Sequence, residues 1–438
     1  MTHCQLGAFH PSRRHILPER FVFISQPCPD SPKHTTKRPM NNNTGILQGV
    51  RVLDLGRIIA GPFCGQILGD LGAEVIKVEH PDGDDTRHWK PPTVGGEAAY
   101  FFAMNRNKSS ICLDLSKPEG LQILKDLVAQ SDVLIENFRP GVTKRLGIDY
   151  AALSAVNPKL VYCSISGFGQ EGPMAGRAAY DYVIQAMSGL MSVTGEPEGT
   201  PIRCGGAVAD YPTGLWATIS ILAALMARQQ TDKGQHIDLS MHDCTLLLMS
   251  QLATQFLASG EPPVRVGNGH GSVVPFYVYD TADQPLMVLC GNDAMFIRMA
   301  EAIGRPDMAS DSRYETNAAR VENQTALHKE IGAALAKEKR DAWIDKLGEA
   351  NVPIAPIRSF PEVFAAQEVL DRDMVLDIPH PTAGTIKALG SPLKFSDTPV
   401  VTSTAPPLLG QHTEEILSEI LDLESNAIAR LKSAGIIA

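Results

Sequence analysis

Short apolar runs alternate with helical patterns over the first half of the chain, and this alternation limits the fold more than any other feature. Residues 50–56 and 74–80 suit buried strands, and 61–72 between them suit a helix that begins at Pro62. Such a βαβ unit favours a parallel sheet with a right-handed crossover. We therefore expect an α/β protein with a Rossmann-like doubly wound domain. The same cycle continues through a strand at 109–115, a helix at 118–130, and strands at 132–138 and 160–169.

The second half predicts a smaller α/β domain and a returning segment. A Gly-, Pro- and Val-rich stretch at 260–276 interrupts the pattern and is typical of a boundary loop. Beyond it, 285–291 suits a strand and 294–304 a helix, while the Pro-rich 405–421 indicates a segment that closes against the first domain. The expected division is a leader at 1–44, a large Rossmann-like domain at 45–230, a linker with the small α/β domain at 231–340, and a return segment at 341–438 that completes the large domain.

Charge and cysteine usage exclude several classes of function. A net charge of -10 repels phosphate backbones and argues against a nucleic-acid binder. The longest apolar stretch, 215–227, is too short for a membrane span. The eight cysteines form no CxxC pair, so neither a zinc site nor a redox dithiol is indicated, and reduced thiols in a cytoplasmic compartment are expected.

The first 39 residues differ from the rest in being rich in basic side chains. Two interpretations stay open: a disordered leader that precedes a working start at Met40, or a mitochondrial transit peptide. The first implies a cytoplasmic protein and the second a mitochondrial one. The basic residues are Arg13, Arg14, Arg20, Lys33, Lys37 and Arg38, against Glu19 and Asp30 alone.

The first βα turn carries an arginine where several well-known motifs would carry glycines. It reads GRIIAGP, and the chain has no P-loop, GxSxG elbow or HExxH motif, which disfavours a nicotinamide dehydrogenase or a kinase. Arg57 follows the first strand, at the edge where open α/β sheets bind ligands. Further cations at strand ends favour a phosphorylated ligand, although each alone is also typical of a solvated surface residue. These are Arg106, Lys108, Arg139, Lys144 and Arg145.

Asp210 stands between a glycine pair and a long apolar helix, in GGAVADYPTG. It has two interpretations, an N-cap of that helix or a nucleophile, because an ionised carboxylate attacks an activated carbonyl without a general base. Gly205 and Gly206 would let backbone N–H groups approach a developing oxyanion. The stretch Gly267–Ser272, GNGHGS, would be either a flexible cover over a reacting group or simply a loop.

Six stretches of the chain resemble the family III CoA-transferases, which include the formyl-CoA and carnitine CoA-transferases. The likeness runs from Gly45 to Ile437. It implies an enzyme in which Asp210 attacks an acyl-CoA thioester and then carries CoA as an aspartyl thioester, with no metal, no permanently bound cofactor, and acyl-CoA and CoA as substrates. The stretches are 52–87, 100–115, 132–141, 178–195, 205–214 and 406–417.

The resemblance also assigns residues to the two halves of the site. Tyr180 and Asp181 would line the acyl site, and Gly269, His270 and Gly271 belong to a mobile glycine loop. The implied partners are an acyl-CoA and a carboxylic acid, without nucleic acid or membrane, in a homodimer of interlocked chains. The implied CoA-binding residues are Arg57, Ile59, Ala60, His80, Leu113, Ser116, Asn137, Phe138, Arg139 and Arg145.

Departures from the family pattern bear on the substrate. Ile59 replaces a glutamine that contacts the acyl group in some members, and His80 and Ser116 replace more basic residues, which disfavours formyl and oxalyl groups. The stretches NRNKSS and GHGSVVPF are most similar to the branch that passes CoA from succinyl-CoA to a dicarboxylate such as glutarate or hydroxymethylglutarate. Two alternatives stay open: an α-methylacyl-CoA racemase, disfavoured because Tyr180 stands where a histidine is expected, and a catalytically idle CoA-binding protein in which Asp210 is only a cap.

Overall fold

The computed structural model describes residues 45–401 and 403–438. The predictions for the leader at 1–44 lie outside the described residues. No helix in these ranges is both long enough and apolar enough to cross a membrane.

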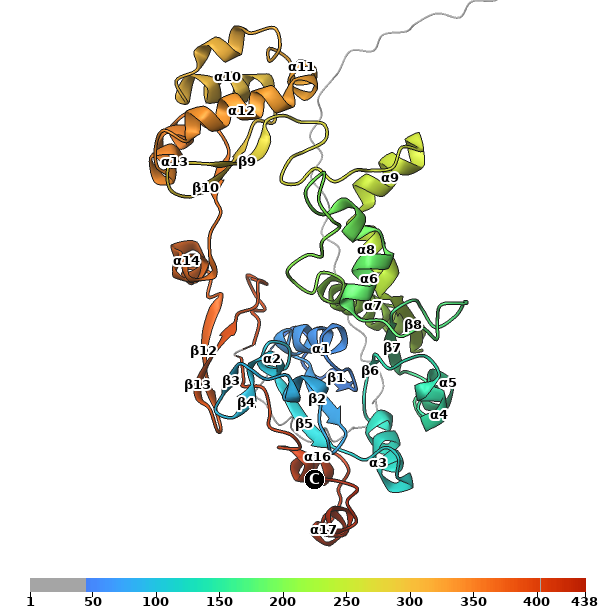
Figure 1. Cartoon of the computed structure of the whole chain (residues 1–438). Coiled ribbons are helices and arrows are strands. Elements are labelled where there is room, and N and C mark those ends of the chain that lie inside the picture. Colours follow the sequence, from blue (N-terminus) through green and yellow to red (C-terminus); the bar gives the residue numbers. More distant parts are fainter. Residues whose placement is uncertain (1–44, 402) are drawn as a thin grey trace, which may run out of the picture. The chain divides into compact units, whose positions relative to one another are not determined.

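A six-stranded sheet, parallel throughout, forms the centre of the large domain (Figure 1). Counted along the chain, its strands lie in the order 3-2-1-4-5-6, the order of doubly wound dinucleotide-binding folds. Val52 and Leu53, neighbours on the first strand, point to opposite faces and are both fully buried, so the sheet is covered on both sides. The expected α/β class is confirmed. In spatial order the strands are β5 (Lys108–Cys112), β2 (Glu74–Glu79), β1 (Arg51–Asp54), β6 (Val133–Glu136), β7 (Val161–Ser166) and β8 (Gln235–Ser240).

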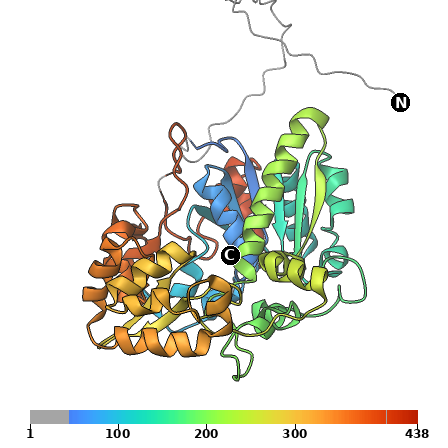
Figure 2. The same ribbon diagram turned by 90° about the horizontal axis from the view of Figure 1, so that it is seen from above.

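Two helices that pack side by side, α1 (Ala60–Asp70) and α7 (Asp210–Thr231), cover one face of the sheet (Figure 2). Gly214 permits their close approach, because a Cβ there would lie 2.9 Å from the carbonyl oxygen of Ala60. The start of α7 is thereby fixed against the start of α1. The other helices of the domain are α2 (Ala99–Phe102), α3 (Pro118–Ala129), α4 (Val142–Leu146), α5 (Tyr150–Val156), α6 (Asp181–Met187), α8 (Met241–Leu248) and α9 (Ser250–Ser259).

A second sheet of three antiparallel strands carries its own core. Its strands are β9 (Phe276–Asp280), β10 (Pro285–Leu289) and β11 (Ile354–Pro356), with helices α10 (Asp293–Ala302), α11 (Asn317–Glu322), α12 (Gln324–Leu335) and α13 (Arg340–Glu349). The predicted boundaries at 230 and 340 do not coincide with the limits of the sheets, because β8 pairs with β7 and β11 pairs with β10. The division of the chain into domains stays a prediction.

The segment before α16 returns to the edge of the large sheet. The backbone N–H of His412 donates to the carbonyl of Ser110 (3.0 Å), and that of Cys112 donates to Thr413 Oγ1 (3.1 Å). Residues close to the end of the chain therefore line β5. The last elements are α14 (Phe360–Ala365), α15 (Gln367–Leu370), the hairpin β12 (Val375–His380) and β13 (Gly384–Leu389), α16 (Thr413–Glu419) and α17 (Ser425–Ser433). The short elements elsewhere are β3 (Thr93–Val94), β4 (Glu97–Ala98), and the 3₁₀ turns η1 (Asp85–His88), η2 (Leu190–Val193) and η3 (Pro306–Ser310).

Candidate active site

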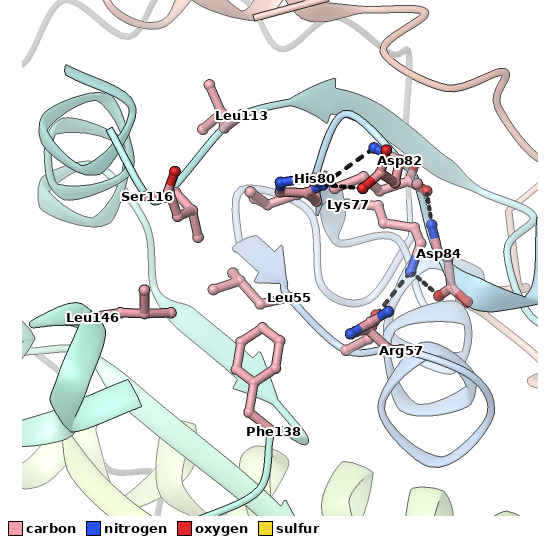
Figure 3. A pocket seen from close by; sticks show the side chains of 15 residues that line it. Leu55, Arg57, Lys77, His80, Asp82, Asp84, Leu113, Ser116, Phe138 and Leu146 are labelled. Atoms are coloured by element: carbon pink, nitrogen blue, oxygen red, sulfur yellow. Dashed lines mark hydrogen bonds and ion pairs between the residues drawn. The ribbon is translucent and has the colours of Figure 1, made fainter. Parts of the chain in front are cut away.

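A pocket of about 380 Å³ opens at the carboxyl ends of β1, β2, β5 and β6 (Figure 3). This edge includes the point between β1 and β6 where the strand order reverses, which is where doubly wound sheets bind their ligands. Among the residues predicted to bind CoA, five line the pocket: Arg57, His80, Leu113, Ser116 and Phe138. The edge of the sheet at which the sequence predicts a ligand site is therefore the edge at which this pocket opens.

The first βα turn is held in a strained shape at the pocket wall. Ile58 has φ 71°, a left-handed conformation that is unfavourable for a β-branched side chain. Its neighbour Arg57 is fixed by Asn137, whose side-chain amide accepts from the Arg57 N–H and donates to the Arg57 carbonyl, both at 2.8 Å. Ile59 and Ala60 are buried at the start of α1, so their side chains do not line the pocket.

A buried ion pair lies beneath this turn. Lys77 Nζ donates to Asp84 Oδ2 (2.9 Å) and to the carbonyl of Gly56 (2.8 Å), and the Ile58 N–H points at both oxygens of Asp84 (3.3 Å). Burial alone would raise the pKa of Asp84, but the Lys77 ammonium and hydrogen bonds from Thr86 hold that pKa well below its ordinary value. Burial would lower the pKa of Lys77, and the carboxylates around it raise that pKa instead. Both groups stay charged.

Two of the predicted strand-end cations do not face a ligand, which corrects that expectation. Lys108 begins β5 instead of following it, and its buried ammonium is satisfied by Asp54 (2.8 Å), Pro62 and Asn105. Burial lowers the pKa of Lys108 to about 8. Arg106 forms a buried ion pair with Asp70. The charges in NRNKSS therefore hold α1 to the sheet.

The remaining predicted cations lie on the surface around the pocket. Arg139 donates to the carbonyl of Gly176 (2.6 Å), and Lys144 and Arg145 are exposed on α4. His80 lies beside Asp82, with 3.2 Å between Nδ1 and the carboxylate, so the pocket mouth also carries acidic groups.

Asp210 is the first residue of α7, but its side chain does not cap that helix. The cap comes from Asp181, the first residue of α6, whose Oδ2 accepts from the backbone N–H groups of Ala209 (2.7 Å) and Asp210 (3.2 Å). Asp181 is buried and held in turn by Gln185 Nε2 (2.5 Å). Within the described ranges no group donates a hydrogen bond to the Asp210 carboxylate. The cap interpretation of Asp210 is therefore wrong in this structure.

The environment of Asp210 favours its neutral form. Burial, and then the negative charge of Asp181, raise the pKa of Asp210 to about 7. Burial, followed by the charges of Tyr211, Asp210, Tyr182 and Asp181, raises the pKa of Tyr100 to about 12. These five residues, Tyr100, Asp181, Tyr182, Asp210 and Tyr211, form what we call the Asp210 cluster. Tyr180 lies next to it in sequence, 62% exposed.

The two glycine stretches differ in how firmly they are held. Around Gly205 and Gly206 a Cβ would meet nothing within 4 Å, so the backbone before Asp210 borders open space. The 267–272 loop is tied at Gly267, whose N–H donates to the carbonyl of Gly195 (3.0 Å). Further along it, the His270 ring packs 5.5 Å from Phe276. Gly269, His270 and Gly271 form no hydrogen bond to the Asp210 cluster within residues 45–401 and 403–438.

Together, the doubly wound sheet, the pocket at its strand ends and a partly exposed carboxylate at the start of a helix are typical of an enzyme that binds a nucleotide-containing ligand. A model of CoA-transferase family III matches residues 47–413, and the chain belongs to that family. The resemblance found in the sequence is thereby confirmed, and the protein is an enzyme of this class.

Curated relatives cover nearly the whole chain. It is 41% identical to succinyl-CoA:glutarate CoA-transferase of Mus musculus over 405 residues, which span 92% of this chain and 93% of the relative. It is 42% identical to succinate–glutarate CoA-transferase of Agrobacterium fabrum over 395 residues, 89% of this chain and 99% of the relative. Among solved structures, a CAIB/BAIF family protein from Brucella suis matches with a TM-score of 0.80 and 42% identity, over 86% of this chain and all of that one.

Lys77 and Asp84 were not predicted from the sequence as a buried ion pair, although the sequence carries a signal for it. Lys77 interrupts the apolar run EVIKVEH, and a lysine inside a strand that is buried on both faces needs a carboxylate partner. The acidic run Asp82–Asp85 a few residues later could have supplied it.

Proposed function

We propose that this enzyme moves CoA from succinyl-CoA to a second dicarboxylate, such as glutarate or hydroxymethylglutarate, through an aspartyl-CoA thioester at Asp210. The observation that carries the proposal is the Asp210 carboxylate, which is partly exposed, accepts no hydrogen bond from the described residues and is backed by the cap that Asp181 provides. The printed functions of the mouse and Agrobacterium relatives support the choice of succinyl and glutarate.

Each step of the proposed reaction balances without an added reagent. An Asp210 oxygen attacks the succinyl thioester carbonyl, the C–S bond breaks, and a mixed anhydride and CoA thiolate result. The thiolate attacks the aspartyl carbonyl of the anhydride, which releases succinate and leaves the aspartyl-CoA thioester. The acceptor carboxylate then attacks the aspartyl carbonyl of that thioester, which releases CoA thiolate and forms a second mixed anhydride. The thiolate attacks the acceptor carbonyl of this anhydride, which gives the acceptor acyl-CoA and frees the Asp210 carboxylate. No proton is gained or lost overall.

The structure offers groups for both ends of the CoA substrate. The pocket beside Arg57, His80, Leu113, Ser116 and Phe138 would hold CoA, with Asn137 fixing the turn and Arg139 and Arg145 near the phosphates. The open backbone at Gly205 and Gly206 would face the anhydride oxygen. Tyr180, Asp181 and the loop of Gly269, His270 and Gly271 would border the acyl group, and we propose no permanently bound cofactor.

The two alternatives lack a supporting observation. A racemase would use a histidine beside the aspartate as a second acid or base, and Tyr180 supplies no imidazole. An idle protein would keep Asp210 as a cap, whereas Asp181 fills that role.

We also propose a homodimer of interlocked chains in the cytoplasm, with a mitochondrial location if residues 1–39 act as a transit peptide. Support for the dimer comes from apolar side chains exposed on neighbouring helices, which would be covered by a second chain. They are Leu215, Ile219 and Met226 on α7, Leu247 on α8, and Phe256 and Leu257 on α9.

Trapping of the intermediate tests the proposed function directly. After incubation with succinyl-CoA and then hydroxylamine or borohydride, peptide mass spectrometry should find modification at Asp210 alone, since an aspartyl thioester or anhydride reacts with these agents and an ordinary side-chain carboxylate does not. Incubation with free CoA is the control and should leave every peptide unmodified. A modified residue other than Asp210 would overturn the assignment of the nucleophile.

Burial and the charge of Asp181 together should set the acid limb of the pH–rate profile, and a substitution can remove the charge. Asp210 must lose its proton to attack, so the rate should rise with pH through about 7 in the wild type. In Asp181→Asn the amide oxygen still accepts from the Ala209 N–H, while the repulsion that favours neutral Asp210 is gone. We expect the acid limb to move to lower pH in steady-state profiles. An unmoved limb would show that Asp181 does not control Asp210.

A further inference from the structure

Arg203 presents an unpaired guanidinium beside the Asp210 cluster. Its NH1 donates to the carbonyls of Cys204 (2.8 Å) and Gly205 (3.2 Å), and the guanidinium lies over the Tyr182 ring, 4.4 Å from the centroid. It forms no ion pair with any carboxylate of the described residues. One nitrogen and the ring contact thus fix its orientation, and its other N–H donors have no partner among residues 45–401 and 403–438.

Arg203 is connected to the nucleophile through short links. The N–H of Cys204, the next residue, donates to Gln185 Oε1 (2.9 Å), and Gln185 Nε2 in turn binds the Asp181 carboxylate that caps α7. Tyr182, whose ring lies against the Arg203 guanidinium, belongs to the Asp210 cluster. Arg203 therefore lies beside a member of the Asp210 cluster, and the open backbone at Gly205 and Gly206 separates Arg203 from Asp210 along the chain.

Electrostatics make such a cation necessary for a dicarboxylate. Asp181 and Asp210 already place two acidic groups in one site, and a substrate with a second carboxylate would add a third. Repulsion would exclude that substrate unless a cation met its distal end. Three other arginines near the site are engaged elsewhere: Arg106 pairs with Asp70, Arg57 with Asp85, and Arg265 with backbone carbonyls of the 192–199 segment.

We infer that Arg203 binds the distal carboxylate of the acyl donor and acceptor and so makes the enzyme selective for dicarboxylates. This inference rests on the proposed CoA transfer through Asp210. A guanidinium stacked on an aromatic ring is well suited to the task, because it keeps its charge and its planar fork matches a carboxylate. Arg203 would thus determine specificity without taking part in the bond changes.

Matched acyl pairs separate recognition from chemistry. Butyryl-CoA has the carbon chain of succinyl-CoA without the distal carboxylate, and pentanoate relates to glutarate in the same way. For Arg203→Gln we expect kcat/KM with succinyl-CoA and glutarate to fall about 10- to 100-fold, the loss of one charged hydrogen-bonded pair. Rates with butyryl-CoA and pentanoate should change less than about 3-fold. Arg203→Lys should recover part of the dicarboxylate rate, since it restores the charge but not the fork.

A second variant controls for the loss of a positive charge. Lys233 is exposed just past the far end of α7, about 30 Å from Asp210 along the helix, and Lys233→Gln should leave both substrate classes unchanged. An equal fall with mono- and dicarboxylates in Arg203→Gln would mean that Arg203 only shapes its loop, and would overturn the inference. If the wild type transfers CoA between no acids, or without modification of Asp210, the proposed function itself fails, whatever Arg203 does.

Discussion

Asp210→Asn should abolish CoA exchange while leaving the protein folded. Removal of a covalent nucleophile lowers turnover by about 10⁴-fold or more, because the remaining binding groups cannot form the intermediate. The expected loss lies in kcat, with acyl-CoA binding retained, since the pocket around Arg57 and His80 is untouched. Exchange of labelled succinate into succinyl-CoA measures the rate, and isothermal titration with CoA measures the binding.

The same variant should be more stable than the wild type at alkaline pH. The pKa of Asp210 is raised in the folded protein, so its contribution to stability is complete below pH 4 and is lost as pH rises through about 7. Asparagine removes that loss, and we expect a gain of about 1–2 kcal/mol in the free energy of unfolding at pH 8, allowing for partial exposure. The gain should vanish near pH 4. A catalytically idle protein with Asp210 as a cap makes a different prediction for Asp210→Ala, a loss of stability and no loss of chemistry.

Asp232 offers a matched control at the other end of the same helix. It is the C-cap of α7, with φ 55°, a conformation that asparagine also tolerates, and its exposed carboxylate contacts Lys159 at 2.5 Å. Asp232→Asn should keep wild-type exchange and stability within about 0.5 kcal/mol. Native rates in a folded Asp210→Asn protein would exclude the aspartyl mechanism.

The sequence predicted the parts of the site that local pattern determines. Strand and helix periodicity placed Arg57, His80 and Phe138 after successive strands, and a parallel sheet brings such strand ends to one edge, where the pocket lies. Lys108 does not follow this rule, because it precedes the strand predicted at 109–115 and lies at the amino end of β5, where its ammonium meets the buried Asp54.

Contacts between distant residues could not be read from periodicity. The cap of α7 comes from Asp181, on an element that precedes Asp210 by almost thirty positions, and nothing in GGAVADYPTG indicates an outside partner. The predicted limit at 230 differs from the limit of the large sheet for a related reason. α7 ends in a turn that resembles a domain boundary, but β8 then pairs with β7 across the sheet.

Loss of the buried pair under the first turn should destabilise the protein strongly. Asp84→Asn removes the carboxylate that contacts the buried Lys77 ammonium, and breaking a buried pair in this way typically costs about 3–5 kcal/mol in the free energy of unfolding. The pKa of Asp84 is lowered, so its contribution is present above about pH 4. That of Lys77 is raised, so its contribution is present below about pH 10. Denaturant unfolding at pH 7 therefore measures the full effect.

A double-mutant cycle separates the pair from its surroundings. Lys77→Met combined with Asp84→Asn removes both charges, so the double variant should lose less stability than the sum of the single variants, with a coupling of about 1–3 kcal/mol. An exposed pair of the same type is the control: Asp377 contacts Lys387 at 2.7 Å on the surface, and Asp377→Asn should cost less than about 1 kcal/mol. A small loss in Asp84→Asn, equal to that in Asp377→Asn, would contradict the role of the buried pair.

The Lys77–Asp84 pair should also affect acyl-CoA binding, because the Asp84 carboxylate supports the strained turn at Ile58. Ile58 keeps its left-handed conformation only while the surrounding structure holds it, and both oxygens of Asp84 face its N–H at 3.3 Å. Once Asp84 no longer pairs with Lys77, the turn can relax and Arg57 leaves its position at the pocket wall. We therefore expect a higher KM for acyl-CoA in folded Asp84→Asn, with a smaller change in kcat. A fall in kcat at constant KM would place Asp84 with the chemistry at Asp210 instead of with the pocket.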